Sequence, residues 1–141
     1  MNEHNQHIVV CVKGIILHQG KILLVKRAAN DSIGAGTWEC AGGKIEFGEK
    51  LDTALMREIE EETSLIITIG KLLYATSFLT DPNRQIILLT YLCTVQENKV
   101  HLSLEHSDYH WCTKDELYRL LPHGVRADFE QNGVFALKEL L

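Results

Sequence analysis

The chain has 141 residues, 45% of them hydrophobic, and a formal net charge of −5 at pH 7. A chain of this length folds as one domain that buries roughly two thirds of its unfolded surface, so residues 1–141 are expected to form a single domain. Its 14 Lys and Arg residues are scattered through the sequence, which argues against a nucleic-acid-binding surface.

The sequence also argues against a membrane protein and a disulfide-rich one. No stretch approaches the ~18 consecutive apolar residues of a membrane-spanning helix, and the polar start MNEHNQH lacks the apolar core of a signal peptide. Four cysteines lie far apart among strand-like apolar residues: Cys11, Cys40, Cys93 and Cys112. We interpret them as buried free thiols of a cytoplasmic protein, because a reducing compartment keeps thiols unpaired.

The first third of the chain is typical of strands joined by turns. Residues 7–17 and 22–28 are rich in β-branched and aliphatic side chains, and the HQGK turn between them predicts a β-hairpin. A loop with two glycines is expected over 29–36, followed by a short apolar and aromatic piece over 37–43.

An acidic helix is predicted over residues 51–62, which contain no Gly or Pro. Its apolar residues recur at three- and four-residue steps and form a narrow core-facing stripe. Glu58, Glu61 and Glu62 share one face, where their charges repel one another and the helix dipole disfavours them. A bound divalent cation would reverse these unfavourable terms, although a solvated acidic face would have the same spacing.

The rest of the chain predicts further strands and two helices. Strands are expected over 65–80, 85–95 and 99–104, and helices over 114–122 and 126–141. Thr113 and Glu116 have the spacing of a capping box at the start of the first of these helices, whereas Gly133 weakens the last one. A mostly β core with helices on its faces indicates an α/β or α+β protein with a mixed sheet.

One segment has a more specific pattern. Gly43 is followed after five residues by Glu49, and after seven more by the run REIEEE from Arg57 to Glu62; Leu65 then closes the segment. This resembles the Nudix box, and the hairpin before it and the EHSDYHWCTKDEL run after it are similar to that family as well. Ser64 stands where the family has a glycine in a left-handed conformation, at a cost on the order of 1 kcal/mol.

The resemblance implies a fold and a reaction. The fold would be an α/β/α sandwich with a central mixed β-sheet and the box as a loop–helix–loop. The reaction would be Mg²⁺- or Mn²⁺-dependent hydrolysis of a nucleoside diphosphate linked to another group. Nucleoside triphosphates, oxidised ones included, lead as substrates and would yield a nucleoside monophosphate and pyrophosphate. ADP-ribose or another nucleotide sugar is the alternative, and a non-catalytic nucleotide sensor is disfavoured because every box carboxylate is present. The partner would therefore be a small-molecule nucleotide, while the sequence leaves a homodimer open.

The resemblance also assigns roles to residues. The metal would be held by Glu58, Glu61 and Glu62 and by the carbonyl of Gly42. Lys44 would face the phosphates beside Gly43, and an ion pair between Arg57 and Glu49 would orient the glutamates.

Several further residues are weaker candidates. The general base would be Glu58 or Glu61, or else one of two acids in the later loop, Glu105 and Asp108, which would otherwise be ordinary loop acids. The spacing of His101, His106 and His110 fits no usual zinc site. Four aromatic residues would either stack on a base or belong to the core: Trp38, Phe47, Phe78 and Tyr109.

Overall fold

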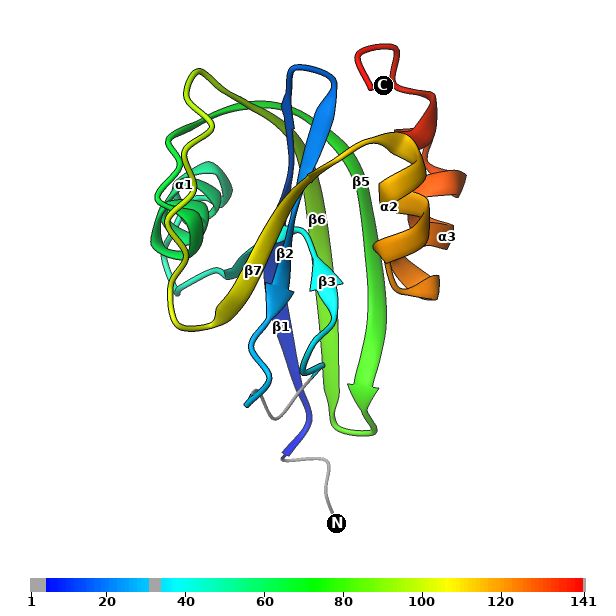
Figure 1. Cartoon of the computed structure of the whole chain (residues 1–141). Coiled ribbons are helices and arrows are strands. Elements are labelled where there is room, and N and C mark those ends of the chain that lie inside the picture. The colour runs from blue at the N-terminus through cyan, green and yellow to red at the C-terminus, as the bar shows by residue number, and fades with distance from the viewer. Residues whose placement is uncertain (1–4, 31–33, 141) are drawn as a thin grey trace.

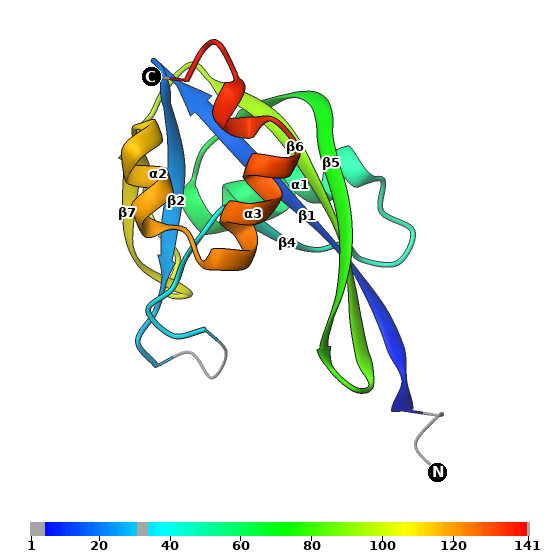
Figure 2. The same cartoon turned by 90° about the vertical axis from the view of Figure 1, so that its right-hand side faces the viewer.

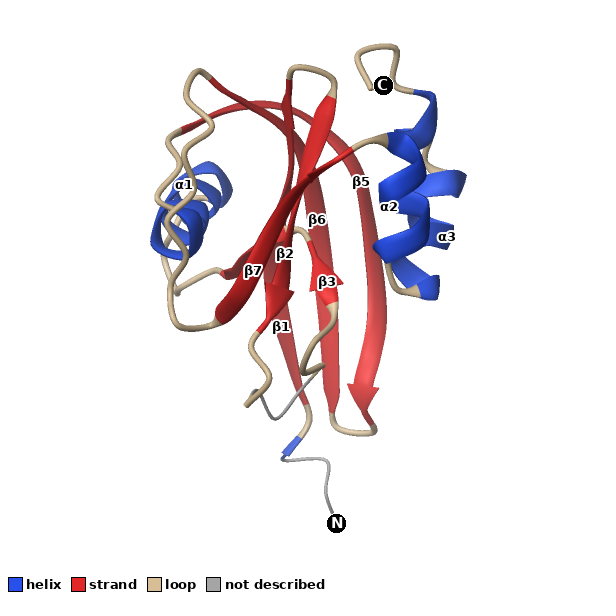
Figure 3. Cartoon of the chain, in the orientation of Figure 1, coloured by secondary structure: helices blue, strands red, loops and turns tan. Residues whose placement is uncertain are grey.

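A mixed β-sheet runs through the middle of the protein, with α1 on one face and α2 and α3 on the other (Figures 1 and 3). The computed structural model describes residues 5–30 and 34–140. The strands are β1 (His7–His18), β2 (Lys21–Arg27), β3 (Trp38–Glu39), β4 (Ala41–Lys44), β5 (Ile67–Asp81), β6 (Arg84–Val95) and β7 (His106–Cys112). The helices are α1 (Leu51–Thr63), α2 (Lys114–Leu120), α3 (His123–Gln131) and the 3-10 helix η2 (Val134–Ala136).

The sheet has the strand order β3-β2-β1-β6-β5, with β4 paired to β1 and β7 paired to β2. β1 and β6 are parallel and the other pairs are antiparallel, so the predicted mixed sheet is confirmed. The β1–β2 hairpin pairs only next to its turn, where Gln19 and Gly20 both have positive φ. Beyond that point the two strands separate, and β1 instead pairs with β4 over Cys11–Gly14, which places the paired glycines beside α1.

Helices cover part of both faces of the sheet, so each face has its own core cluster. Val12 and Ile16 of β1 join a core cluster with the apolar stripe of α1. Ile15 and Leu17 point to the opposite face, where Phe129 of α3 belongs to the second cluster. This alternation follows the two-residue period of a strand. Figure 2, turned by 90°, shows α3 in front of the sheet and α1 behind it.

Most predicted elements are confirmed. The hairpin, the two long strands and the acidic helix occupy the expected ranges to within a few residues. At the start of α2, the Thr113 side chain accepts a hydrogen bond from the Glu116 N–H, and the Glu116 side chain accepts one from the Thr113 N–H, so the capping box is present. Ser64 follows α1 with φ 66°, in the left-handed conformation that the resemblance implies.

Two predicted elements are wrong. Residues 99–104 form no strand; instead, the N–H groups of His101 and Ser103 donate to the carbonyls of Thr63 and Glu62 at the end of α1. This segment therefore pairs with orphan carbonyls of the helix rather than with the sheet. The helix predicted over 126–141 has other bounds: α3 begins earlier, at His123 after Pro122, and ends at Gln131, because the chain turns at Gly133, where φ is 74°. Residues 31–33 of the predicted loop and residue 141 lie outside the described part.

None of the helices in the described ranges has the length and apolar character needed to cross a membrane. All four cysteines are free thiols, three of them buried and Cys11 half-buried.

Candidate active site

A cavity of about 590 Å³ is lined by residues of α1, α3 and the sheet. Among the described residues, its charged lining has as many basic groups as carboxylates: Lys13, Arg27, Lys44 and Arg84 beside Glu39, Glu58, Glu62 and Glu105. The paired glycines of β4, Gly42 and Gly43, also line it. Its apolar lining comes from β5, β6 and α3, and includes Tyr74, Phe78, Ile86, Leu88, Val125 and Phe129. The cavity thus combines charged groups of both signs with aromatic and aliphatic side chains.

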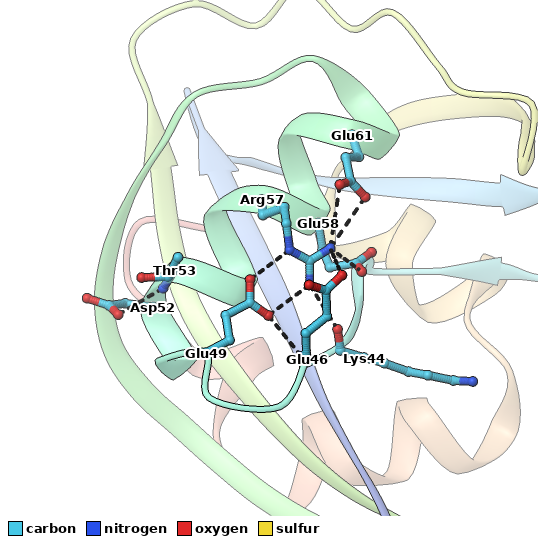
Figure 4. Close-up of polar contacts among 8 residues, drawn as sticks. All are labelled: Lys44, Glu46, Glu49, Asp52, Thr53, Arg57, Glu58 and Glu61. Carbon is cyan, nitrogen blue, oxygen red and sulfur yellow. Dashed lines mark hydrogen bonds and ion pairs between the residues drawn. The ribbon is translucent and has the colours of Figure 1, made fainter.

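Arg57 organises the carboxylates on the α1 side (Figure 4). Its Nε and Nη2 donate to the two oxygens of Glu49 at 2.7 and 2.9 Å, and its Nη1 donates to Glu58 Oε1 at 2.9 Å. Nη2 also donates to the carbonyl of Lys44 at 3.2 Å. The bidentate contact lowers the pKa of Glu49 to about 2 and raises the pKa of Arg57. The implied ion pair is therefore present, and it ties α1 to the end of β4.

Glu49 in turn shapes the loop that leads into α1. Its Oε1 accepts the N–H of Glu46 at 2.9 Å, and its own N–H donates to the carbonyl of Glu46 at 3.0 Å. Gly48 lies between them with φ 82°, a conformation that favours glycine. A tight turn thus holds Glu49 where the guanidinium of Arg57 reaches it.

The paired glycines allow a close approach between β4 and its neighbours. Gly42 has φ 150°, and a Cβ there would collide with the Val12 carbonyl of β1. A Cβ on Gly43 would collide with the carboxylate of Glu58. Glu58 can therefore lie directly against the β4 backbone only because Gly43 has no side chain.

Glu62 is the most deeply buried of the box carboxylates, with 5% of its surface exposed. Its Oε1 accepts the N–H of Gly42 at 3.0 Å. Burial raises the pKa of Glu62 to about 7, against the opposing effects of Lys13 and of the Gly42 hydrogen bond. Burial also raises the pKa of Glu58, and the hydrogen bond from Arg57 opposes that rise. The protein alone therefore disfavours negative charge at both carboxylates.

A buried network next to Glu62 was not predicted from the sequence. Glu39 Oε1 lies 3.4 Å from Lys13 Nζ and 3.2 Å from Arg27 Nε, while its Oε2 lies 2.9 Å from His106 Nε2. Burial raises the pKa of Glu39, but the hydrogen bond with His106 and the charges of Lys13 and Arg27 outweigh it and lower the pKa to about 2. The only sequence signal was a single acid inside the apolar piece TWECAGG.

The donor set fits a divalent cation. Glu62, Glu105 and His106 each offer one ligand atom, and these atoms lie within 4.8 Å of one another. Carboxylate oxygens suit Mg²⁺ and Mn²⁺, and a cation would offset the charge that burial disfavours. His106 Nδ1 is buried and has no hydrogen-bond partner among the described residues, as expected of an atom placed to meet a ligand.

The structure separates the predicted catalytic acids. Glu105 lines the cavity, but Asp108 is exposed on β7, is not among the described lining residues, and accepts the N–H of Tyr109 at 2.8 Å. Glu61 is exposed and lies 3.5 Å from Arg57 Nη1. Lys44 lines the cavity, and Figure 4 shows its side chain extending away from the carboxylates around Arg57.

The histidine and aromatic candidates are dispersed. His110 Nε2 lies 2.6 Å from Glu116 Oε2 on the surface, whereas His106 contacts Glu39. Of the four aromatic residues, only Phe78 lines the cavity among the described residues. Phe47 is fully exposed, Tyr109 is exposed on β7, and Trp38 packs against the second core cluster.

The chain is similar to known proteins over most of its length. The model of the NUDIX domain matches residues 5–131. The CTP pyrophosphohydrolase of Escherichia coli (strain K12) is 36% identical over 120 residues, which are 84% of this chain and 87% of that protein. The nucleoside triphosphatase NudI of Escherichia coli O139:H28 is 30% identical over 122 residues, 79% and 85% of the two chains. The crystal structure of a MutT protein from Methanosarcina mazei Go1 superposes with a TM-score of 0.82 at 27% identity, covering 94% of this chain and 98% of that one.

Proposed function

Because this chain belongs to the Nudix hydrolase family, we propose that it hydrolyses nucleoside triphosphates to a nucleoside monophosphate and pyrophosphate, with Mg²⁺ or Mn²⁺ as cofactor. The observation that carries the proposal is the cavity, which is lined by carboxylates, by basic side chains and by aromatic and aliphatic ones. The carboxylates would hold the cation that a polyphosphate needs, the basic side chains suit its negative charge, and a nucleobase suits the apolar part. The names of the two Escherichia coli relatives support a triphosphate substrate.

The metal would be held by the box carboxylates and by the carbonyl of Gly42, with Glu105 facing Glu62 from the loop before β7. The box carboxylates in question are Glu58, Glu61 and Glu62. When bound, the cation neutralises phosphate charge and lowers the pKa of a coordinated water. Lys44 binds the phosphates from the cavity wall.

Glu58 is the proposed proton acceptor for the attacking water. Its Oε1 is held by Arg57 at 2.9 Å, while its Oε2 lies against Gly43 at the cavity wall. Arg57 and Glu49 act as positioning residues, because their bidentate contact fixes the side chain that also holds Glu58. Asp108 has no part in this proposal, because it is exposed on β7 and is not among the described residues that line the cavity.

A substrate panel with Mg²⁺ tests the proposal. Nucleoside triphosphates, their oxidised forms and ADP-ribose are compared, and pyrophosphate, phosphate and nucleoside monophosphate are measured separately. The expected products from a triphosphate are a monophosphate and pyrophosphate. Faster turnover of ADP-ribose would replace the substrate class, and nucleotide binding without any product would indicate a sensor.

Two variants test the role of the carboxylates. Glu58→Gln keeps the shape of the side chain but removes its charge, and it should lower kcat by about 10²-fold or more. Glu60→Gln on the exposed face of the same helix is the matched control and should retain activity.

A further inference from the structure

Three potential metal ligands come together from two distant parts of the chain. Glu62 belongs to α1, whereas Glu105 and His106 stand at the start of β7. The Ser103 N–H donates to the Glu62 carbonyl at 3.0 Å, and the Glu105 carbonyl accepts the N–H of Ala28 at 3.0 Å. The segment that carries Glu105 and His106 is therefore fastened both to α1 and to the end of β2. This fixes its position relative to Glu62.

The surroundings of His106 determine which ring nitrogen is available. Its side chain is 2% exposed, and Nε2 lies 2.9 Å from Glu39 Oε2. Lys13 and Arg27 pair with the other oxygen of Glu39, and they favour its ionised form. The contact with Glu39 engages Nε2, so Nδ1 is the ring nitrogen that remains available to a ligand.

Nδ1 is buried and makes no hydrogen bond to any described residue. A buried polar atom without a partner is costly, and an imidazole whose other nitrogen is hydrogen-bonded to a carboxylate has the arrangement usual for a metal-bound histidine. Glu62, Glu105 and His106 each offer one ligand atom, and these three atoms lie within 4.8 Å of one another.

We propose that His106 is a nitrogen ligand in a mixed cation site with Glu62 and Glu105, oriented by the Glu39 carboxylate. The proposal deepens the metal dependence stated above, on which it rests, by adding an imidazole that the carboxylate pattern of the box does not contain. Imidazole nitrogen suits Mn²⁺ and later transition ions better than it suits Mg²⁺. The protein should therefore bind Mn²⁺ more tightly than a site of carboxylates alone would allow.

Pulsed electron paramagnetic resonance of the Mn²⁺-loaded protein tests this directly. Untagged protein is used, so that histidines of a purification tag do not contribute. A nitrogen hyperfine coupling from a directly bound imidazole is expected, and its coupling should change when the protein is labelled with nitrogen-15 in the histidine rings. Because labelling changes no residue, this result does not depend on any variant folding. Mn²⁺ bound without a histidine coupling, or no binding of Mn²⁺ at all, would overturn the proposal.

Matched variants assign the coupling to one histidine. His106→Gln should abolish the nitrogen coupling and weaken Mn²⁺ binding by about 10-fold or more, with a smaller loss for Mg²⁺. His110→Gln is the control, because His110 lies on the same strand but pairs with Glu116 at the surface. A coupling that persists in His106→Gln would show that another histidine binds, or that His106 only braces Glu39. A coupled Mn²⁺ site in a protein that hydrolyses no triphosphate would refute the proposed function and leave this site intact.

Discussion

The burial of Glu62 predicts that one substitution stabilises the metal-free protein in a pH-dependent way. Glu62→Gln removes the charge while keeping the size of the side chain and an oxygen that can accept the Gly42 N–H. A carboxyl whose pKa rises from 4.5 to about 7 on folding costs about 3 kcal/mol once it is ionised in both states, at about 1.36 kcal/mol per decade. Glutamine does not carry this cost.

The sign follows from proton binding. Below about pH 4.5 Glu62 is protonated in the folded and the unfolded protein, so it contributes no difference. Between that pH and about 7 the folded protein keeps a proton that the unfolded chain releases, and the stability of the wild type falls as the pH rises. The gain from Glu62→Gln should therefore be small near pH 5 and should approach about 3 kcal/mol near pH 8, on the order of 10 °C in Tm.

Thermal unfolding in EDTA near pH 5 and near pH 8 measures this gain in stability. Glu60→Gln, on the exposed face of α1, is the control and should show no comparable change with pH. Mg²⁺ should stabilise the wild type more near pH 8 than near pH 6, because the ligand must lose its proton, and it should stabilise Glu62→Gln much less. A gain that is equal at the two pH values, or a less stable variant near pH 8, would refute the argument from burial.

Three further predictions concern the same helix. Arg57→Ala should lower kcat by about 10- to 100-fold and should also lower the Tm of the metal-free protein, because it removes the guanidinium that contacts Glu49 and Glu58. An unchanged Tm of the metal-free protein would show that this network does not support the fold. Ser64→Gly should be more stable than Ser64→Ala by about 1 kcal/mol in denaturant unfolding. Both variants lose the hydrogen bond to the His101 carbonyl, but only glycine adopts the positive φ of this position without strain. Equal stabilities would contradict this. Millimolar Mg²⁺ should raise Tm by an amount that fits RT ln(1 + [L]/Kd), and excess EDTA should abolish hydrolysis; full activity in EDTA would exclude a metal enzyme.

The parts of the site that were predictable depend on residues close together in the chain. The i, i+3, i+4 spacing alone puts Glu58, Glu61 and Glu62 on one side of a helix. Arg57 and Glu49 are eight residues apart and are joined by the turn before that helix. The shared helical face follows from spacing, whereas the ion pair was expected from the resemblance to the Nudix box.

The Glu39 network was not predictable because strands far apart in the sequence create it. Glu39 and His106 are 67 residues apart, and they meet because β3 and β7 both pair with β2. A single sequence does not determine that register. The strand wrongly predicted over 99–104 also depends on a contact between distant parts of the chain. Its alternating apolar residues do pack on the core, with Val100 buried. Its N–H groups, however, donate to carbonyls of α1 and not to a neighbouring strand.

The ionised form of Glu62 has two separate energetic costs. The first can be read from the sequence, because its charge repels neighbouring glutamates on the same helical face. The second is visible only in the fold, where burial disfavours its ionised form and His106, with an unsatisfied nitrogen, lies beside it. Either cost alone would be relieved by replacing the acid with a neutral residue. A divalent cation would relieve both costs at once and would also give the histidine nitrogen a partner, so the proposed site accounts for the charge, the burial and the histidine together.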